Sequence, residues 1–423
     1  MDKHRTPGYF GPGDYHPDDP TIYPFTIDIS STVLDDLKDR LRKSRITHSQ
    51  IEECQDFEYG FNLTILNKYL DYWRDQYDWR EAERELNSFP NFKTEIEGLK
   101  IHFIHSKPPA GYDRVVPILA SHGWPGSIHE FHRVIPILTD PKSHGIQTDI
   151  AFEVVCPSIP GYGFSDSPSK KGCDQISVAR IYNTLMTRLG YQRYFVQGGD
   201  WGSTLVGLVS RIFPERVIGC HLNMMTSSNK GFLFRAVLGS IAPRMMFADS
   251  EFHTYTVKNM IRLFFKSGGY FLLQGNTPDT IGIALNDSPI GLMAWILEKF
   301  VGGTNMTWAK TADGNLERKY TTHDLITNLM IYWVNGNALQ AGRFYKEMLQ
   351  SPETKRLTNE YIKVPTGYAA CLNDAIPALP KELAKKIANI QHYSILHDVG
   401  HFAAFEEPEL LAKDVFKFAS TLA

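Results

Sequence analysis

The sequence predicts an α/β protein with a mostly parallel sheet, a helical insertion and an N-terminal meander. Strand-like and helical runs alternate from Val115 onward, a helix-rich stretch interrupts them between about residues 223 and 352, and strand-like sequence resumes at Lys363. Strands that alternate with helices form parallel sheets with right-handed connections. We expect four segments: an N-terminal arm and meander, the first part of the core, a helical lid and the second part of the core, at residues 1–110, 111–222, 223–358 and 359–423.

Length and composition narrow the class of protein. The 423 residues are 43% hydrophobic, enough for a large core and an apolar pocket, and the formal net charge of -3 argues against a nucleic-acid partner. Five scattered cysteines without a CxxC pair indicate reduced thiols, not a disulfide framework or a zinc site. No apolar run approaches the ~20 residues of a membrane-spanning helix, and the N-terminus has no secretory signal. We expect a soluble, cytoplasmic protein without a membrane anchor.

The N-terminal segment shows structural patterns only. Residues 1–22 are rich in Pro, Gly, Asp and Tyr and indicate an irregular arm. Ser30, Ser31 and Thr32 offer N-caps to a helix that places Leu34, Leu37 and Leu41 on one face. Ile96 to Ile104 has the pattern of a strand, with a turn expected at Gly98. We expect this segment to pack on the core and to carry no chemistry.

The first part of the core contains four short apolar runs that predict strands: Val115 to Ala120, Phe152 to Cys156, Tyr194 to Gln197 and Val217 to Leu222. Between them, Val178, Ile181 and Leu185 follow helical spacing, and Gly190 predicts the end of that helix. Sites in parallel sheets gather at the carboxyl ends of strands. The loops after these runs are therefore the places to look for chemistry.

The string Gln197-Gly198-Gly199-Asp200-Trp201-Gly202-Ser203 follows one of these strands. Small residues two before and two after the central residue allow a sharp strand-to-helix turn, the elbow that presents a nucleophile. Here the central residue is an aspartate, which would form an alkyl ester and so points to attack on an sp3 carbon, such as an epoxide or an alkyl halide. The competing interpretation is a tight glycine-rich turn with a surface carboxylate.

An alkyl ester needs a base that activates water, and histidine suits this role because its pKa lies near neutrality. His401 follows the last expected strand, Tyr393 to Leu396, and His397 is its local competitor. Asp374 follows the strand-like run that begins at Lys363 and could orient the base. The order nucleophile, acid, histidine is that of the α/β-hydrolase core.

Hydrolysis of the ester also needs N–H donors for the oxyanion. The amide of Trp201, directly after the expected nucleophile, is one candidate. The amide of Trp124 in the turn His122-Gly123-Trp124-Pro125 is the other.

These motifs together resemble the microsomal-type epoxide hydrolases, over nearly the whole chain from about Tyr23. The resemblance rests on Gly198-Gly199-Asp200-Trp201-Gly202, His122-Gly123-Trp124-Pro125-Gly126-Ser127, Val364-Pro365-Thr366-Gly367, Gly400-His401-Phe402-Ala403-Ala404 and Glu407-Pro408-Glu409-Leu410, and on strings in the lid and the meander.

The resemblance implies an α/β-hydrolase fold and a cofactor-free, metal-free conversion of an apolar epoxide and water to a vicinal diol. It assigns the nucleophile to Asp200, the base to His401 and the orienting acid to Asp374, where mammalian members carry Glu. It adds two lid tyrosines, Tyr270 and Tyr345, as hydrogen-bond donors to the epoxide oxygen. It also implies detoxification or aromatic hydrocarbon catabolism, a soluble fungal or bacterial type of member, and a homodimer.

Two other activities use the same residues. A haloalkane dehalogenase also carries an Asp-Trp elbow, but halide departure needs no proton and so no tyrosine pair. A biosynthetic cyclase would open the epoxide with a hydroxyl of the substrate in place of water. A binding protein on this fold is a third alternative, which the complete set of nucleophile, acid, base and donors disfavours.

Overall fold

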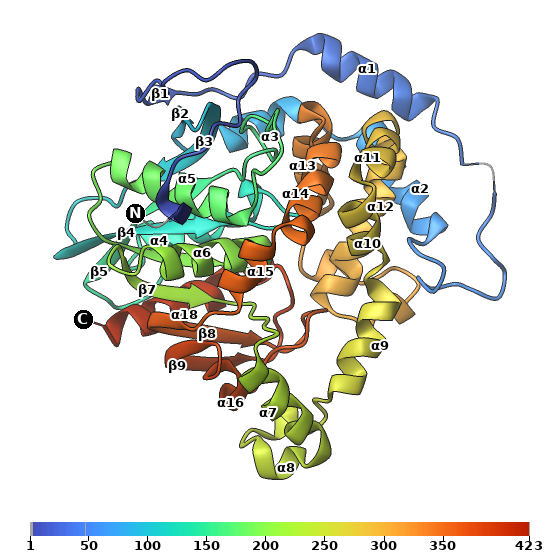
Figure 1. Ribbon diagram of the computed structural model, residues 1–423. Helices are drawn as coiled ribbons and strands as arrows, with labels where there is room; N and C mark the ends of the chain where they lie inside the picture. The colour runs from blue at the N-terminus through green and yellow to red at the C-terminus, as the bar shows by residue number, and fades with distance from the viewer. Residues whose placement is uncertain (1–2, 47, 423) are drawn as a thin grey trace.

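The computed structural model describes residues 3–46 and 48–422, and its centre is a nine-stranded sheet with the order β1-β2-β3-β5-β4-β6-β7-β8-β9 (Figure 1). The strands are β1 (Tyr23–Pro24), β2 (Asn91–Ile96), β3 (Leu99–Ser106), β4 (Arg114–Ser121), β5 (Ile150–Pro157), β6 (Tyr194–Gly198), β7 (Val217–Leu222), β8 (Ile362–Cys371) and β9 (Ala388–Leu396). Strands β4 to β9 pair in parallel, whereas β1, β2 and β3 extend the β5 edge in antiparallel fashion. The expected α/β class with a mostly parallel sheet is confirmed.

The core helices cover the sheet in two contacting pairs, α5 with α6 and α4 with α18. Their bounds, with those of the two short helices near the C-terminus, are α4 (Val134–Thr139), α5 (Gln175–Arg188), α6 (Asp200–Ile212), α16 (Lys381–Ala384), α17 (Ala403–Glu406) and α18 (Pro408–Ser420). Helix α5 begins where the Asp174 side chain accepts a hydrogen bond from the Ser177 amide, and Gly190, at a φ of 92°, allows the chain to turn away after it.

The insertion between β7 and β8 is a helical lid beyond the carboxyl ends of the parallel strands (Figure 1). It consists of α7 (Lys230–Ile241), α8 (Pro243–Met246), α9 (Val257–Ser267), α10 (Gly269–Asn276), α11 (Pro278–Asp287), α12 (Pro289–Thr304), α13 (Thr322–Asn335), α14 (Asn337–Gln350) and α15 (Pro352–Thr358). The lid therefore faces the loops that carry the candidate residues.

The N-terminal segment packs against the lid as well as the core. Its helices are α1 (Ser31–Arg42), α2 (Leu63–Asp75) and α3 (Trp79–Leu86), and α1 and α2 both contact α12 (Figure 1). The Trp73 indole donates to the Met330 sulfur at 3.2 Å, so this contact is part of the buried core. Of the three expected N-caps of α1, Ser31 and Thr32 lie inside the helix, and Ser30 is the N-cap residue but its side chain makes no capping hydrogen bond.

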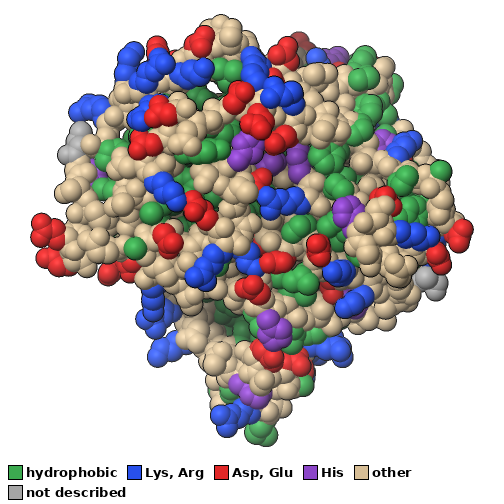
Figure 2. Space-filling view, turned by 180° about the vertical axis from the view of Figure 1, so that it is seen from behind, with side chains coloured by type: hydrophobic (Ala, Val, Ile, Leu, Met, Phe, Trp, Pro, Cys, Tyr) green, Lys and Arg blue, Asp and Glu red, His purple; other side chains and the backbone are tan. Residues whose placement is uncertain are grey.

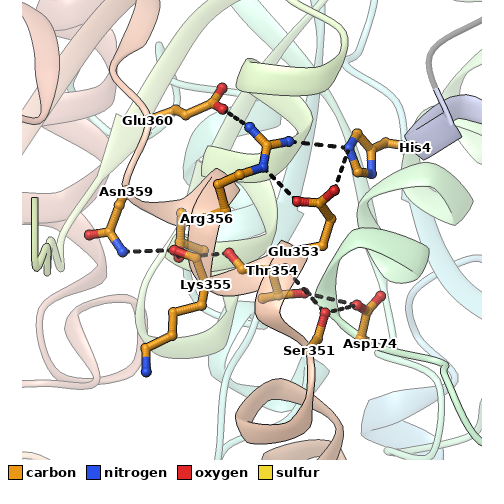
Figure 3. A network of polar contacts seen from close by, with 10 residues as sticks. His4, Asp174, Ser351, Glu353, Thr354, Lys355, Arg356, Asn359 and Glu360 are labelled. Atoms are coloured by element: carbon orange, nitrogen blue, oxygen red, sulfur yellow. Dashed lines mark hydrogen bonds and ion pairs between the residues drawn. The ribbon is translucent and has the colours of Figure 1, made fainter.

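A polar network fastens the end of the lid to the core. Ser351 Oγ and Thr354 Oγ1 donate to the same Asp174 oxygen at 2.7 and 2.9 Å (Figure 3). Asp174 also caps α5, so one carboxylate joins the start of a core helix to the start of α15. Arg356 links α15 to His4 at 3.4 Å. The lid thus returns to the core at a fixed point.

In the described ranges, no single helix is both long and apolar enough to cross a membrane. Helices α11 and α12 reach that length and hydropathy only together, and their axes differ by 115°.

Candidate active site

The turn between β6 and α6 places Asp200 at a strained point of the backbone. Its φ is 46°, a left-handed conformation that costs a non-glycine residue about 1–2 kcal/mol. The turn also brings the start of α6 against β4, and a Cβ on Gly202 would lie 1.9 Å from the Ser121 carbonyl oxygen. The small residues of the elbow are therefore required by close backbone approach, as the sequence pattern predicts.

Both oxygens of the Asp200 carboxylate have a partner. The Trp124 amide donates to Oδ1 at 2.8 Å, and His401 Nε2 lies 3.2 Å from Oδ2. The turn that carries Trp124 is close to the elbow, since a Cβ on Gly123 would lie 2.4 Å from Asp200 Cβ. The structure gives the Trp201 amide no hydrogen bond to the carboxylate, but this amide is in the first turn of α6, where N–H groups have no partner within the helix.

Asp374 and His401 come together from the loops after β8 and β9. His401 Nδ1 lies 2.9 Å from Asp374 Oδ1, and the side chain of Asp374 is buried while that of His401 is 10% exposed. Burial tends to lower the pKa of His401, but the carboxylates of Asp374 and Asp200 outweigh it and raise that pKa well above its ordinary value. The imidazole is therefore protonated at neutral pH while both carboxylates are charged. His397, the local competitor, is exposed, and its nearest acidic partner is Glu251 at 3.9 Å.

Glu406 holds the loop around His401, a role that no pattern in the sequence indicates. Its two carboxyl oxygens accept hydrogen bonds from the amides of Gly400 and Phe402, at 2.7 and 2.8 Å. Burial raises the pKa of Glu406 to about 8, against the effect of these two hydrogen bonds. The His401 amide itself donates to the Gly303 carbonyl of α12 at 3.0 Å, so the base is fixed from the core and from the lid.

A small cavity of about 10 Å³ lies beside Asp200 and His401, and Glu130 lines it. This volume is close to the minimum that holds one water molecule. Glu130 belongs to a short 3-10 helix (Ile128–Phe131), and burial raises its pKa to about 8. Sequence reasoning missed Glu130, although it lies within two turns of the His122-Gly123-Trp124 string.

A second cavity, of about 340 Å³, opens on the lid side of the same residues. Trp124, His401 and Phe402 line both cavities. Most of the remaining wall is apolar and comes from α9, α10 and α12 and from the loop after β8: Met260, Leu263, Phe264, Phe271, Met306, Ile376 and Pro377 are among its residues. A space of this size and character suits an apolar organic molecule.

The two expected lid tyrosines lie side by side against Trp124. The Tyr270 ring stacks on the Trp124 ring at 4.8 Å, and the Tyr345 ring meets it edge-on at 5.8 Å. Tyr270 lines the large cavity, whereas Tyr345 is buried behind it, and the Tyr345 hydroxyl has no hydrogen-bond partner among the described residues. Burial raises the pKa of both tyrosines, with the Asp200 carboxylate adding to the rise, so both hydroxyls keep their protons at neutral pH.

Trp201 lies outside the walls of both cavities. Its ring packs edge-on against Tyr345, with centroids 4.7 Å apart, and its indole nitrogen is buried. A halide site that uses this indole would need it at the cavity wall, where the structure places Trp124 instead.

All five cysteines are buried and free. Among the described residues, one group, Cys54, Asp56 and Glu58, has ligand atoms close enough together for a metal ion. It lies in the N-terminal segment, and none of its members lines either cavity beside Asp200.

Comparison with known proteins identifies the family. The profile described as "Epoxide hydrolase N terminus" matches residues 22–131, and the profile of the alpha/beta hydrolase fold matches residues 116–245. Epoxide hydrolase 1 of Oryctolagus cuniculus is 43% identical over 419 residues, which is 97% of this chain and 92% of that protein. The chain belongs to the microsomal-type epoxide hydrolase family. Its activity class, epoxide hydrolase, follows from the same near-full-length similarity.

Solved structures agree with this epoxide hydrolase fold. The crystal structure of juvenile hormone epoxide hydrolase from the silkworm Bombyx mori has a TM-score of 0.91 at 36% identity and covers 98% of both chains. The Aspergillus niger epoxide hydrolase has a TM-score of 0.76 at 30% identity, covering 95% of this chain and 97% of that one. Thus the expected likeness to fungal members is present but weaker than the likeness to these animal proteins.

Proposed function

We propose that this epoxide hydrolase converts an apolar epoxide to a vicinal diol through a covalent alkyl ester on Asp200. The observation that carries the proposal is the placement of the Asp200 carboxylate, between the Trp124 amide at 2.8 Å and His401 Nε2 at 3.2 Å. Next to it lie an apolar cavity of about 340 Å³ and a cavity with room for one water. The nucleophile is therefore positioned between a space for the epoxide and a space for the second reactant.

The first half-reaction opens the ring. Because the Trp124 amide holds Oδ1, the free electron pairs of Oδ2 attack the epoxide carbon, and the carbon–oxygen bond of the ring breaks. The leaving oxygen becomes an alkoxide, which hydrogen bonds from the Tyr270 and Tyr345 hydroxyls would stabilise. Their raised pKa values keep these donors protonated until the alkoxide forms.

The charge on His401 couples the two half-reactions. Ester formation neutralises Asp200, one of the two carboxylates that raise the His401 pKa, so the imidazolium becomes more acidic. Its proton then neutralises the alkoxide. His401 is then neutral and can act as a base, with Asp374 still fixing Nδ1 at 2.9 Å.

The second half-reaction releases the diol. His401 takes a proton from the water as its oxygen bonds to the ester carbonyl carbon, and the Trp124 and Trp201 amides stabilise the oxyanion. The bond between the carbonyl carbon and the oxygen of the alkyl group then breaks. Asp200 is left as a carboxylic acid, and its proton moves to the departing diol oxygen. Asp200 is again a carboxylate and His401 again an imidazolium, so one epoxide and one water have given one diol.

Two variants test this scheme on an aryl epoxide such as styrene oxide. We expect Asp200→Asn to abolish turnover, and His401→Gln to accumulate the ester, seen as an intact-mass increase equal to one epoxide. His397→Gln, which changes an exposed histidine four residues before His401, is the matched control. Multiple turnover by Asp200→Ala would contradict the scheme.

In the cyclase alternative a hydroxyl of the substrate, and not Asp200, attacks the epoxide carbon, so no ester forms and no water is consumed. The small cavity beside Asp200 has room for one water, which supports hydrolysis. Turnover in ¹⁸O-labelled water separates the two, because hydrolysis places one labelled oxygen first on Asp200 and later in the diol, and cyclisation incorporates none.

A further inference from the structure

One end of the lid exposes an unusual number of large apolar side chains. On α7, the exposed ones follow helical spacing and form a single stripe: Leu233, Phe234, Val237, Leu238 and Ile241. On the opposite side of the same helix, Phe232 and Ala236 are buried. Helix α7 therefore turns one apolar face to the protein and a second to the solvent.

Helix α9 repeats this pattern and contacts α7. None of its residues is buried, and the side chains of Ile261, Phe264 and Phe265 are 53%, 45% and 80% exposed. Met245 on α8 (88% exposed) and Leu272 and Leu273 on α10 extend the surface. We call this surface the α7–α10 face; in Figure 1, α7, α8 and α9 form the lower end of the lid and α10 lies above them.

Such a surface is rare on a soluble monomer, where exposed apolar residues are usually scattered singly. Of the twenty large hydrophobic side chains that are exposed in the described part of the chain, eleven lie on these four helices. They occupy residues 230–276, about a ninth of the sequence. The concentration indicates a surface that a partner covers.

The same segment carries an excess of positive charge. Residues 226–276 hold six basic side chains, Lys230, Arg235, Arg244, Lys258, Arg262 and Lys266, and two acidic ones, Asp249 and Glu251. The segment is thus at +4 in a chain whose net charge is -3. None of the six cations makes an ion pair with a residue in the described ranges. Figure 2 shows lysine and arginine side chains on both sides of the protruding end of the molecule.

We propose that the α7–α10 face docks on the surface of an anionic lipid bilayer. Exposed Phe, Leu, Ile and Met side chains beside unpaired Lys and Arg are the combination by which interfacial helices insert into the headgroup region of a membrane. On α9, Lys258, Arg262 and Lys266 are spaced four residues apart, so they form a basic stripe along the apolar one.

A second copy of this chain fits the face less well. A symmetric dimer places the same patch on both subunits, so six unpaired cations would meet six others. Like charges brought together in this way oppose association. Anionic lipid supplies the opposite charge to all six.

The position of the face gives the docking a consequence, which rests on the proposed function. Met260, Leu263 and Phe264 of α9 line the 340 Å³ cavity, and Phe264 is also part of the exposed face. The helix between cavity and solvent is thus the helix that would lie in the membrane surface. An apolar epoxide dissolved in the lipid could reach Asp200 without crossing water.

The test is vesicle sedimentation of the full chain, which does not depend on catalysis. Vesicles of phosphatidylcholine with about one-third phosphatidylserine should bind the protein, and vesicles of phosphatidylcholine alone should bind it far more weakly. Lys258→Gln, Arg262→Gln and Lys266→Gln together should weaken binding to the anionic vesicles by roughly a hundredfold, at roughly fivefold for each charge. Phe234→Ser with Phe265→Ser should also weaken it, since both side chains are largely exposed, at 68% and 80%.

Matched control variants remove the same number of charges and of aromatic rings from other parts of the surface. Lys100→Gln, Lys363→Gln and Lys417→Gln remove three exposed charges from the core, and Tyr15→Ser with Tyr59→Ser removes two aromatic rings that are 73% and 75% exposed. These variants should bind vesicles like the unsubstituted protein. All variants should keep their thermal unfolding temperature and their turnover of a water-soluble epoxide, because none of the changed residues lines a cavity beside Asp200.

Three results would overturn the proposal: no binding to anionic vesicles, equal loss of binding in the control variants, or a dimer that Phe234→Ser with Phe265→Ser converts to monomer while vesicle binding is unchanged. The last, seen by analytical ultracentrifugation, would assign the face to a second copy of the chain. Failure of the Asp200 scheme would leave the vesicle result unaffected, so the two proposals are separable.

Discussion

Replacing Asp374 by Asn should slow hydrolysis of the Asp200 ester more than it slows formation of that ester. The carboxylate of Asp374 faces His401 Nδ1 at 2.9 Å, and the same oxygen, Oδ1, accepts the Ile376 amide at 2.8 Å. Because the Ile376 N–H must meet an acceptor, the Asn side chain should keep its carbonyl oxygen at this position. The substitution then preserves the tautomer of His401 and removes only the negative charge.

The size of the effect follows from that geometry. A hydrogen bond to a charged group contributes about 1–2 kcal/mol more than a neutral one. The attraction between an imidazolium and a carboxylate about 4 Å apart reaches about 4 kcal/mol at the effective dielectric constant of about 20 found in proteins. A loss of about 2–4 kcal/mol in the step that forms the imidazolium corresponds to ester hydrolysis roughly 30- to 1000-fold slower. Ring opening, in which His401 loses a proton, should change less than about tenfold.

Single-turnover experiments with intact-mass detection measure both steps. In Asp374→Asn, the ester on Asp200 should form and persist, whereas the unsubstituted protein should show little of it at steady state. The matched control is Asp398→Asn, three residues before His401, whose side chain is 77% exposed and paired with Lys319. Ester hydrolysis in Asp374→Asn as fast as in this control would refute the role given to the Asp374 charge.

Three further changes test other parts of the site. Tyr345→Phe should slow ring opening roughly hundredfold, while Tyr255→Phe, which removes another buried unpartnered hydroxyl of the lid, should leave it unchanged in the same rapid-quench assay. Glu406→Gln leaves one backbone N–H beside His401 without an acceptor and should lower the free energy of unfolding by about 1–3 kcal/mol in denaturant titrations, unlike the exposed Glu409→Gln. Glu130 has a folded-state pKa of about 8 against an ordinary 4.5, so it holds a proton in the folded state that the unfolded state has lost, and its contribution to stability falls as pH rises through that window. As the pH rises from about 5 to about 8, Glu130→Gln should therefore gain roughly 4 kcal/mol in stability relative to the unsubstituted protein. A difference in unfolding temperature that stays constant across this range would contradict the expectation.

The parallel strands could be predicted because burial on both faces makes them continuous apolar runs. The run Val115 to Ala120 is observed as Arg114–Ser121 and the run Val217 to Leu222 has the expected bounds, but the last strand, expected at Tyr393 to Leu396, begins five residues earlier at Ala388. The antiparallel edge could not be predicted in the same way. Strand β1 is only Tyr23–Pro24, two exposed residues that pair with β2 across nearly 70 positions of sequence, and nothing in their composition marks a strand.

The residues of the site likewise include some that the sequence predicts and some that it does not. Asp200, His401 and Asp374 were identifiable because each follows a strand at the same edge of the sheet, and the structure brings His401 within hydrogen-bond distance of both carboxylates. Glu130 and Glu406 were not identifiable, because the sequence around each resembles the polar face of an ordinary helix. Their burial comes from how the loops pack, and local residue patterns do not report that.

Contacts with the N-terminal segment and the core distinguish two parts of the lid. Helices α1 and α2 brace α12, and Asp174 ties the start of α15 to the core. The floor of the lid, which carries Tyr345 and the carbonyl that fixes the His401 amide, is thereby held in place. In the described ranges the main helix contacts of α9 are with α7 and α10, so access for a bulky substrate depends on displacement of α9, and the positions of Tyr345 and His401 need not change in each cycle.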